Sequence, residues 1–446
     1  MIRPAIKRIA LLLCICLLLS SLAACGDPQA TSGTTKPAVE EVDYAAQLKL
    51  DMKSSTLKQE VTVKTFVDGD TVHFNVPVSV MADGVLKARF LAVNTPESTG
   101  KIEEYGKAAS KFTREKLENA VSIILESDTD TWNADSTGGR YLVWVWYKTA
   151  DMDDYRNLNI EILQNGLAIA SNSGGNIYGD TALAAIAQAQ AMKLNVHSGK
   201  KDPDFYYGEA AELDLKELRT NVSAYNGMKV AFNGIVAVNS NNSVYVEAYD
   251  SETDMYYGMS VYYGYGLSGD GLQILNVGNE VRIVGTVQYY EAGGTWQVSG
   301  LTYRAMKPND PNNIQKLSEG HSPAYVLTDP QRFVSGTVDV VVDDTVTTLR
   351  YSELAMSTSI RMEGLVVKSV YTTDKEESSS NGAMTLTCEV NGITIEIRTV
   401  VLLDANGNLI TEDAYLGKTI DVNGIVDCYD GNYQIKVFSA NGITVH

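Results

Sequence analysis

The alternation of polar and apolar positions predicts a small sheet followed by a helix near the start of the folded chain. The predicted strands cover residues 61–67, 71–76 and 85–93. Turn residues Asp68-Gly-Asp70 separate the first two strands, and Pro96 ends the third. Residues 105–120 then repeat apolar side chains on one face, which is typical of an amphipathic helix.

The pattern of polar and apolar positions predicts further strands and helices up to about residue 196. Strands are expected at 121–125 and 140–147, and helices at 158–164 and 181–194. Before the first strand, the segment from Val42 to about Lys58 is expected to contain only a short helix. These elements define an expected domain at 60–200, and the polar segment Gly199–Asp204 is expected to be a linker.

Beyond the linker, two segments repeat one pattern. Each has a strand broken by a glycine, then Gly-x-x-apolar-x-apolar-x-Gly, then a hairpin; the copies run from Val230 to Val298 and from Ile360 to Ile435. A glycine inside a strand suits a sharply coiled barrel strand or a bulge. The pattern predicts OB-like five-stranded barrels at 208–305 and 335–446, joined by a linker at 306–334.

The first residues have the pattern of an export signal. Basic residues precede an apolar run at Ile9–Leu19, which is too short for a comfortable membrane span. Leu22-Ala-Ala-Cys25-Gly26 then resembles a bacterial lipobox, in which the cysteine carries the lipid. We therefore expect a signal peptide at 1–24, a lipid on Cys25, a tether at 25–59, and a protein held on the extracellular side of the cell membrane. The alternative is a secretory signal cut near Ala24.

The composition of the chain excludes some classes of function. The formal net charge of -19 argues against a protein that coats polyanions, because such affinity comes mainly from Lys and Arg. The four histidines are scattered, and no His or Cys cluster has zinc spacing. Outside the N-terminal segment only Cys388 and Cys428 remain, and they are either a disulfide or two free thiols.

Unusual polar residues lie at the corners of the predicted meander: Asp70, Arg89, Asn94, Thr95 and Glu97. Clustered oxygen donors suit a hard cation such as calcium. A carboxylate just past a strand end can polarise a water, and an arginine can hold a phosphate with its planar fork. Taken alone, these residues also fit an ordinary turn and the opening of a helix.

Several short motifs that follow one another in a particular order support the catalytic interpretation of these residues. Asp68-Gly-Asp-Thr71, Arg89-Phe-Leu-Ala-Val-Asn-Thr-Pro-Glu97 and Gly139-Arg140, together with Glu104-Tyr-Gly before a helix, resemble the thermonuclease (staphylococcal-nuclease-like) family. The resemblance covers about residues 61–196. It implies an OB-type five-stranded barrel with helices, so the whole chain is expected to be mostly β with some α.

The resemblance also implies roles for the residues that match. Glu97 would be the general base, and Arg89 and Arg140 would clamp the phosphate. The Asp70 and Asn94 side chains and the Thr95 carbonyl would bind calcium, with Asp68 orienting a metal-bound water. The family usually has Asp where this chain has Asn94, so weaker calcium binding is expected.

The implied substrate is DNA or RNA, but the chain departs from the family around the nucleotide. The Lys-Tyr pair that precedes Gly-Arg in the family is absent from Asp135-Ser-Thr-Gly-Gly-Arg140, which is also one residue longer. The expected function is a membrane-anchored extracellular calcium-dependent nuclease. The alternatives are a surface lipoprotein with weakened or lost activity, which binds nucleic acid, glycan or protein through its OB-like barrels, and a purely structural surface protein.

The middle barrel is rich in tyrosine, with residues at positions 256, 257, 262, 263, 265, 289 and 290. Such side chains can stack on bases or sugars. They also commonly fill and face strands. Because few basic residues lie beside them, the structural interpretation is favoured.

Overall fold

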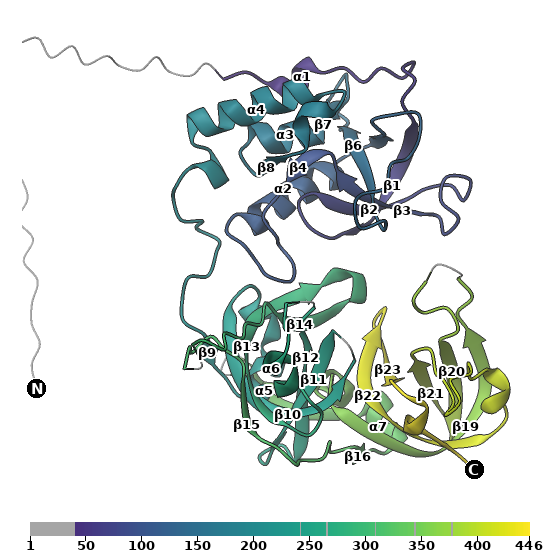
Figure 1. Cartoon of the computed structure of the whole chain (residues 1–446). Helices are drawn as coiled ribbons and strands as arrows, with labels where there is room; N and C mark the ends of the chain where they lie inside the picture. The colour runs from purple at the N-terminus through teal and green to yellow at the C-terminus, as the bar shows by residue number, and fades with distance from the viewer. Residues whose placement is uncertain (1–40, 241, 265, 308, 343–344, 376–377) are drawn as a thin grey trace, which may run out of the picture. The chain divides into compact units, whose positions relative to one another are not determined.

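The computed structural model describes residues 41–446, except 241, 265, 308, 343–344 and 376–377. The described chain is mostly β and contains three closed five-stranded barrels (Figure 1). The predicted fold class is therefore confirmed. The predicted signal peptide, the lipid site at Cys25 and the first part of the tether lie outside the described residues.

The first barrel contains β1 (Lys58–Phe66), β2 (Thr71–Asn75), β3 (Val85–Phe90), β5 (Ser122–Glu126) and β6 (Tyr141–Lys148). The strands follow the order β1-β2-β3-β6-β5, and β5 pairs with β1 to close the barrel. All pairs are antiparallel except β3 with β6. The core includes the fully buried rings of Trp144, Trp146 and Tyr147.

The remaining elements of this domain are α1 (Tyr44–Gln47), β4 (Ala92–Asn94), α2 (Gly106–Glu118), β7 (Arg156–Asn157), α3 (Leu158–Gln164), β8 (Ile169–Ser171) and α4 (Gly179–Met192). The predicted helices are confirmed with shifts of one or two residues. The predicted strand at 85–93 is two strands instead. The break occurs because Ala92 takes a left-handed conformation (φ 64°), after which β4 pairs with β8.

The second and third barrels have the same strand connectivity as the first. The second contains β10 (Lys229–Asn239), β11 (Ser243–Asp250), β12 (Met255–Tyr262), β13 (Glu280–Tyr290) and β14 (Thr295–Ser299). The third contains β19 (Ser359–Thr372), β20 (Met384–Val390), β21 (Ile393–Thr399), β22 (Thr419–Tyr429) and β23 (Asn432–Val437). In each, the third and fifth strands pair in parallel. The sequence repeat therefore marks a repeated topology.

Short elements complete these barrels: β9 (Ala211–Glu212), α5 (Leu215–Thr220), α6 (Asp270–Ile274), β17 (Thr337–Val342), β18 (Thr345–Arg350), α8 (Tyr351–Leu354) and β24 (Ile443–Val445). The segment expected to be a linker at 306–334 also contains strands. Its β15 (Gln315–Ser318) pairs with β13, its β16 (Val326–Leu327) pairs with β19, and α7 (Pro330–Ser335) begins within it. Strands this short have no periodicity that a sequence can reveal.

The structure also bears on the cysteines and tyrosines. Cys388 and Cys428 are free thiols on β20 and β22, two strands that both pair with β19. Tyr257 and Tyr263 are buried, and their hydroxyls donate to Thr253 and Asn239. The structural interpretation holds for these two tyrosines, whereas Tyr289 and Tyr290 are exposed. Among the described residues, no helix is long and apolar enough to cross a membrane.

Candidate active site

Strand register brings the predicted site residues to one end of the first barrel. Arg89 on β3 lies opposite Thr71 on β2, so Asp70 at the preceding turn is beside the arginine. The parallel pairing of β3 with β6 places Arg89 opposite Leu142, and Arg140 immediately precedes β6. Residues more than fifty positions apart in the chain therefore meet because β3 and β6 are neighbouring strands of the barrel.

Arg89 is the centre of a hydrogen-bond network. One terminal nitrogen donates to Asp70 Oδ1 in an ion pair, and the other donates to Asn94 Oδ1 at 2.6 Å. Asp70 is fully buried, and its second oxygen accepts the backbone N–H of Thr95 at 2.8 Å. Burial of the guanidinium lowers the pKa of Arg89, although Asp68 opposes that shift. The two side chains among the three predicted metal ligands thus share one cationic partner.

Close packing against α2 fixes the Asp68-Gly69-Asp70 turn. A Cβ on Gly69 would lie 2.8 Å from the Ala109 side chain and 2.9 Å from that of Thr95. Thr113, also on α2, donates its hydroxyl to the Gly69 carbonyl at 2.6 Å. Only glycine fits this position, so the turn holds Asp70 rigidly under Arg89.

Glu97 follows β4 at the same end of the barrel. Glu97 is an exposed residue, but its carboxyl group loses part of its hydration there. This desolvation raises the pKa of Glu97, and the nearby Asp68 raises it further, while Arg89 and Arg140 partly offset both. Burial also raises the pKa of Asp68. A carboxylate with a raised pKa beside two arginines suits a proton acceptor.

Arg140 is held by a residue that sequence reasoning did not select. Its Nε donates to Asp135 Oδ2 at 2.7 Å, and the Asp135 backbone N–H donates to the Arg140 carbonyl at 2.8 Å. Hydrogen bonds from Thr137 and Arg140 lower the pKa of Asp135 although its burial acts in the opposite direction. Within the described chain, the terminal nitrogens of Arg140 have no hydrogen-bond partner, so they are free to bind an anion. The only sequence signal was that Asp135 belongs to the same turn.

The predicted calcium ligands form an all-oxygen set. The Asp70 and Asn94 side-chain oxygens converge, since both accept from one guanidinium. The buried hydroxyl of Thr95 has no hydrogen-bond partner among the described residues. No group of three or more His, Cys, Asp or Glu side chains in the described chain could hold a metal. One carboxylate with neutral oxygens is a donor set that a hard cation accepts, and in this structure Arg89 contacts the Asp70 and Asn94 oxygens of that set.

The fold and site define an OB-type barrel that gathers two arginines, a glutamate with a raised pKa and convergent side-chain oxygens. Such a set is suited to phosphodiester chemistry. The comparison with known families agrees: residues 87–198 match the family described as staphylococcal nuclease homologue. This part of the chain, called the nuclease-like domain below, is similar to that family, and the match supports a nuclease-type function in general.

Proposed function

We propose that the protein is a calcium-dependent nuclease that hydrolyses phosphodiester bonds of DNA or RNA outside the cell. The observation that carries the proposal is that strand register brings Arg89 and Arg140 to one end of the barrel, and that the carboxyl group of Glu97, in the loop after β4, lies within the electrostatic influence of both. Two cations and one base converge there, as hydrolysis of an anionic ester requires. The family match at 87–198 supports the reaction class.

In the proposed reaction, the substrate phosphate binds between the two guanidinium groups. Arg140 presents its terminal nitrogens, while Arg89 exchanges part of its contact with Asn94 for a phosphate oxygen. Glu97 accepts a proton from a water, whose oxygen then bonds to phosphorus as the bond between phosphorus and the ester oxygen breaks. The leaving oxygen takes its proton from solvent water. Charge builds on the phosphoryl oxygens in the transition state, and both arginines stabilise it.

Calcium would be held by the side chains of Asp70 and Asn94 and the carbonyl of Thr95. When bound, it would supply positive charge next to the phosphoryl oxygens. The staphylococcal nuclease family is generally calcium-dependent, which supports this assignment. Since Asp70 contributes the only formal charge of the three ligands, we expect a requirement on the order of 10⁻⁴–10⁻³ M, typical of extracellular sites.

The activity can be tested with the purified chain that lacks the N-terminal signal. Single-stranded and double-stranded DNA and RNA are incubated with calcium, with chelator, and with calcium restored after chelation. The expected result is cleavage that chelator stops and calcium restores. Binding without cleavage under all conditions would support the alternative of a surface lipoprotein that holds nucleic acid through its barrels.

The proposed function includes a location on the outside of the cell membrane. The motivation is Leu22-Ala-Ala-Cys25 after a short apolar run, which supports a lipid on Cys25 and a mature protein on the outer face of the cell membrane. Cys25→Ala should release the protein into the medium or leave it unprocessed. A mutant that stays in the membrane fraction at its normal mature mass would overturn the lipid assignment.

A further inference from the structure

The segment after the last helix of the nuclease-like domain contacts the loop that carries Glu97. This segment, residues 198–202, overlaps the stretch Gly199–Asp204 that was expected to be a polar linker. In the structure, Asp202 is buried (3% exposed), and its Oδ2 accepts the backbone N–H of Tyr105 at 2.6 Å. The Tyr105 hydroxyl lies 3.0 Å from Ser198 Oγ and donates to the Lys200 carbonyl at 3.1 Å. Both ends of Tyr105 are thus held by this segment.

Tyr105 has a backbone conformation that needs such support. Its φ of 65° lies in the left-handed region, which is an outlier for a bulky side chain. It immediately precedes α2, yet its own side chain does not cap the helix. Asp202, from a distant part of the chain, accepts the N–H of Tyr105 itself, and its negative charge lies at the N-terminus of α2, the favourable end of the helix dipole.

The constraint on Tyr105 extends to Glu97 through the loop between them. The Glu97 carbonyl accepts the Glu103 N–H at 2.9 Å, and the Glu97 N–H donates to the Glu103 carboxylate at 3.2 Å. Gly106, next to Tyr105, packs so closely that a Cβ would lie 2.1 Å from the Glu97 carbonyl oxygen. A shift of Tyr105 would therefore be transmitted directly to the backbone of Glu97.

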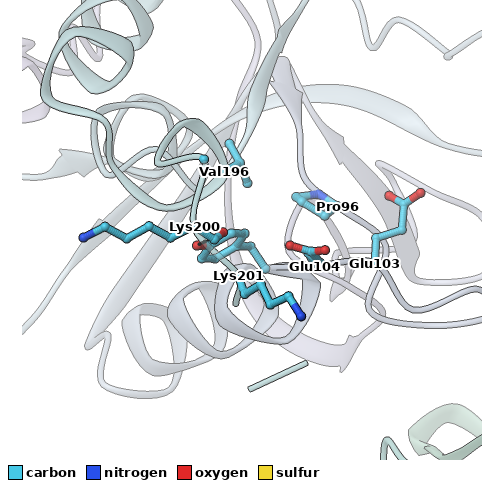
Figure 2. A pocket seen from close by; sticks show the side chains of 8 residues that line it. Pro96, Glu103, Glu104, Val196, Lys200 and Lys201 are labelled. Atoms are coloured by element: carbon cyan, nitrogen blue, oxygen red, sulfur yellow. Dashed lines mark hydrogen bonds between the residues drawn. The ribbon is translucent and has the colours of Figure 1, made fainter. Parts of the chain in front are cut away.

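Figure 2 shows the hollow between these two stretches of chain, with Pro96 and Glu104 facing the side that carries Val196 and Lys201. Two lysines line this hollow, which suggests an anion site. However, the Lys200 side chain points away from the other labelled residues, and two glutamates share the lining. The charges do not converge, so the hollow itself is not assigned a ligand.

We propose that Asp202 is a positioning residue for the hydrolysis reaction, which sets the place of Glu97 by fixing Tyr105 in its left-handed conformation. The inference rests on the proposed function in that Glu97 is the base. It assigns to residues 198–202 a role in the site rather than in joining domains. The base would be displaced without Asp202, because no other described group accepts the Tyr105 N–H.

The test uses the full chain with Asp202→Ala, the milder Asp202→Asn, and the matched control Asp204→Asn. Asp204 lies in the same stretch but is exposed. Asp202→Ala should lower kcat roughly 10- to 100-fold with little change in KM, because misplacing a catalytic group by about 1 Å has that effect. Asp202→Asn keeps an acceptor oxygen and should recover part of the rate, and Asp204→Asn should match wild type.

Two further measurements separate positioning from general damage. In a Glu97→Gln background, Asp202→Ala should cause no further loss, since the group it positions no longer accepts a proton. An equal loss in both backgrounds would overturn the proposal. If Asp202→Ala does not fold, as judged by thermal unfolding, the same cycle is run with Asp202→Asn.

Hydrogen exchange of the peptide covering residues 97–106 gives a readout that does not depend on activity. We expect faster exchange in Asp202→Ala and no change in Asp204→Asn. Unchanged exchange in Asp202→Ala would refute the contact's role. If wild type proves inactive on every nucleic acid tested, the proposed function fails, and the exchange result still decides whether residues 198–202 hold the loop.

Discussion

Arg89 donates to Asn94 Oδ1 at 2.6 Å while its other terminal nitrogen pairs with Asp70. The group formed by these three side chains is electrically neutral, because Asn94 adds an acceptor without a charge. An aspartate at position 94 would leave one negative charge in excess. If the proposed calcium site is correct, we expect position 94 to control how strongly the site attracts the cation.

Asn94→Asp should lower the calcium concentration needed for half-maximal activity, because it adds an anionic oxygen next to the cation. The maximal rate should change less than the midpoint, as Glu97 and both arginines are untouched. The measurement is activity against calcium at fixed substrate, with calcium binding followed by calorimetry. An unchanged or raised midpoint would show that position 94 does not face the cation.

Glu97→Gln tests the proposed base. The substitution keeps the shape of the side chain and removes its ability to accept a proton, so the rate should fall ~10²–10⁴-fold with calcium saturating. Substrate affinity should change little, because the arginines bind the phosphate. Glu104→Gln, in the same loop, is the matched control. Wild-type rates in Glu97→Gln would rule out the proposed mechanism.

Asp135 should act through Arg140. Asp135→Asn is expected to lower kcat/KM roughly 10-fold, because a charge-assisted hydrogen bond is about twice as strong as a neutral one. In an Arg140→Ala background the same change should have no further effect. The exposed Asp130, changed to asparagine, is the control. Additive losses in the double variant would mean that Asp135 acts by another route.

The two cysteines of the third barrel, Cys388 and Cys428, should behave as separate thiols. Burial raises the pKa of Cys388 to about 12, so its thiolate is scarce at neutral pH. In a chain that begins at residue 41, a thiol reagent at pH 8 should label the half-buried Cys428 first and Cys388 only after unfolding. Labelling of neither thiol in unfolded, unreduced protein would reveal a disulfide instead.

The sequence by itself determined the three barrels and the main catalytic candidates. Alternation and turn residues located most strands, because a half-buried strand needs an apolar residue at every second position. The repeated glycine pattern in the second half marked a repeated topology, because a glycine inside a strand suits a sharply coiled barrel strand or a bulge. The motifs around Asp70, Arg89, Glu97 and Arg140 could be identified from the sequence, because each lies within a few residues of a strand end.

Only the tertiary structure decided which partners those residues have. The pairing of Asn94 with Arg89, and of Asp135 with Arg140, depends on side-chain orientation, which no spacing rule fixes. The contact of Asp202 with Tyr105 joins residues 97 positions apart. A polar segment such as 198–202 has no periodic signal, since its role comes from a single buried hydrogen bond and not from an apolar face.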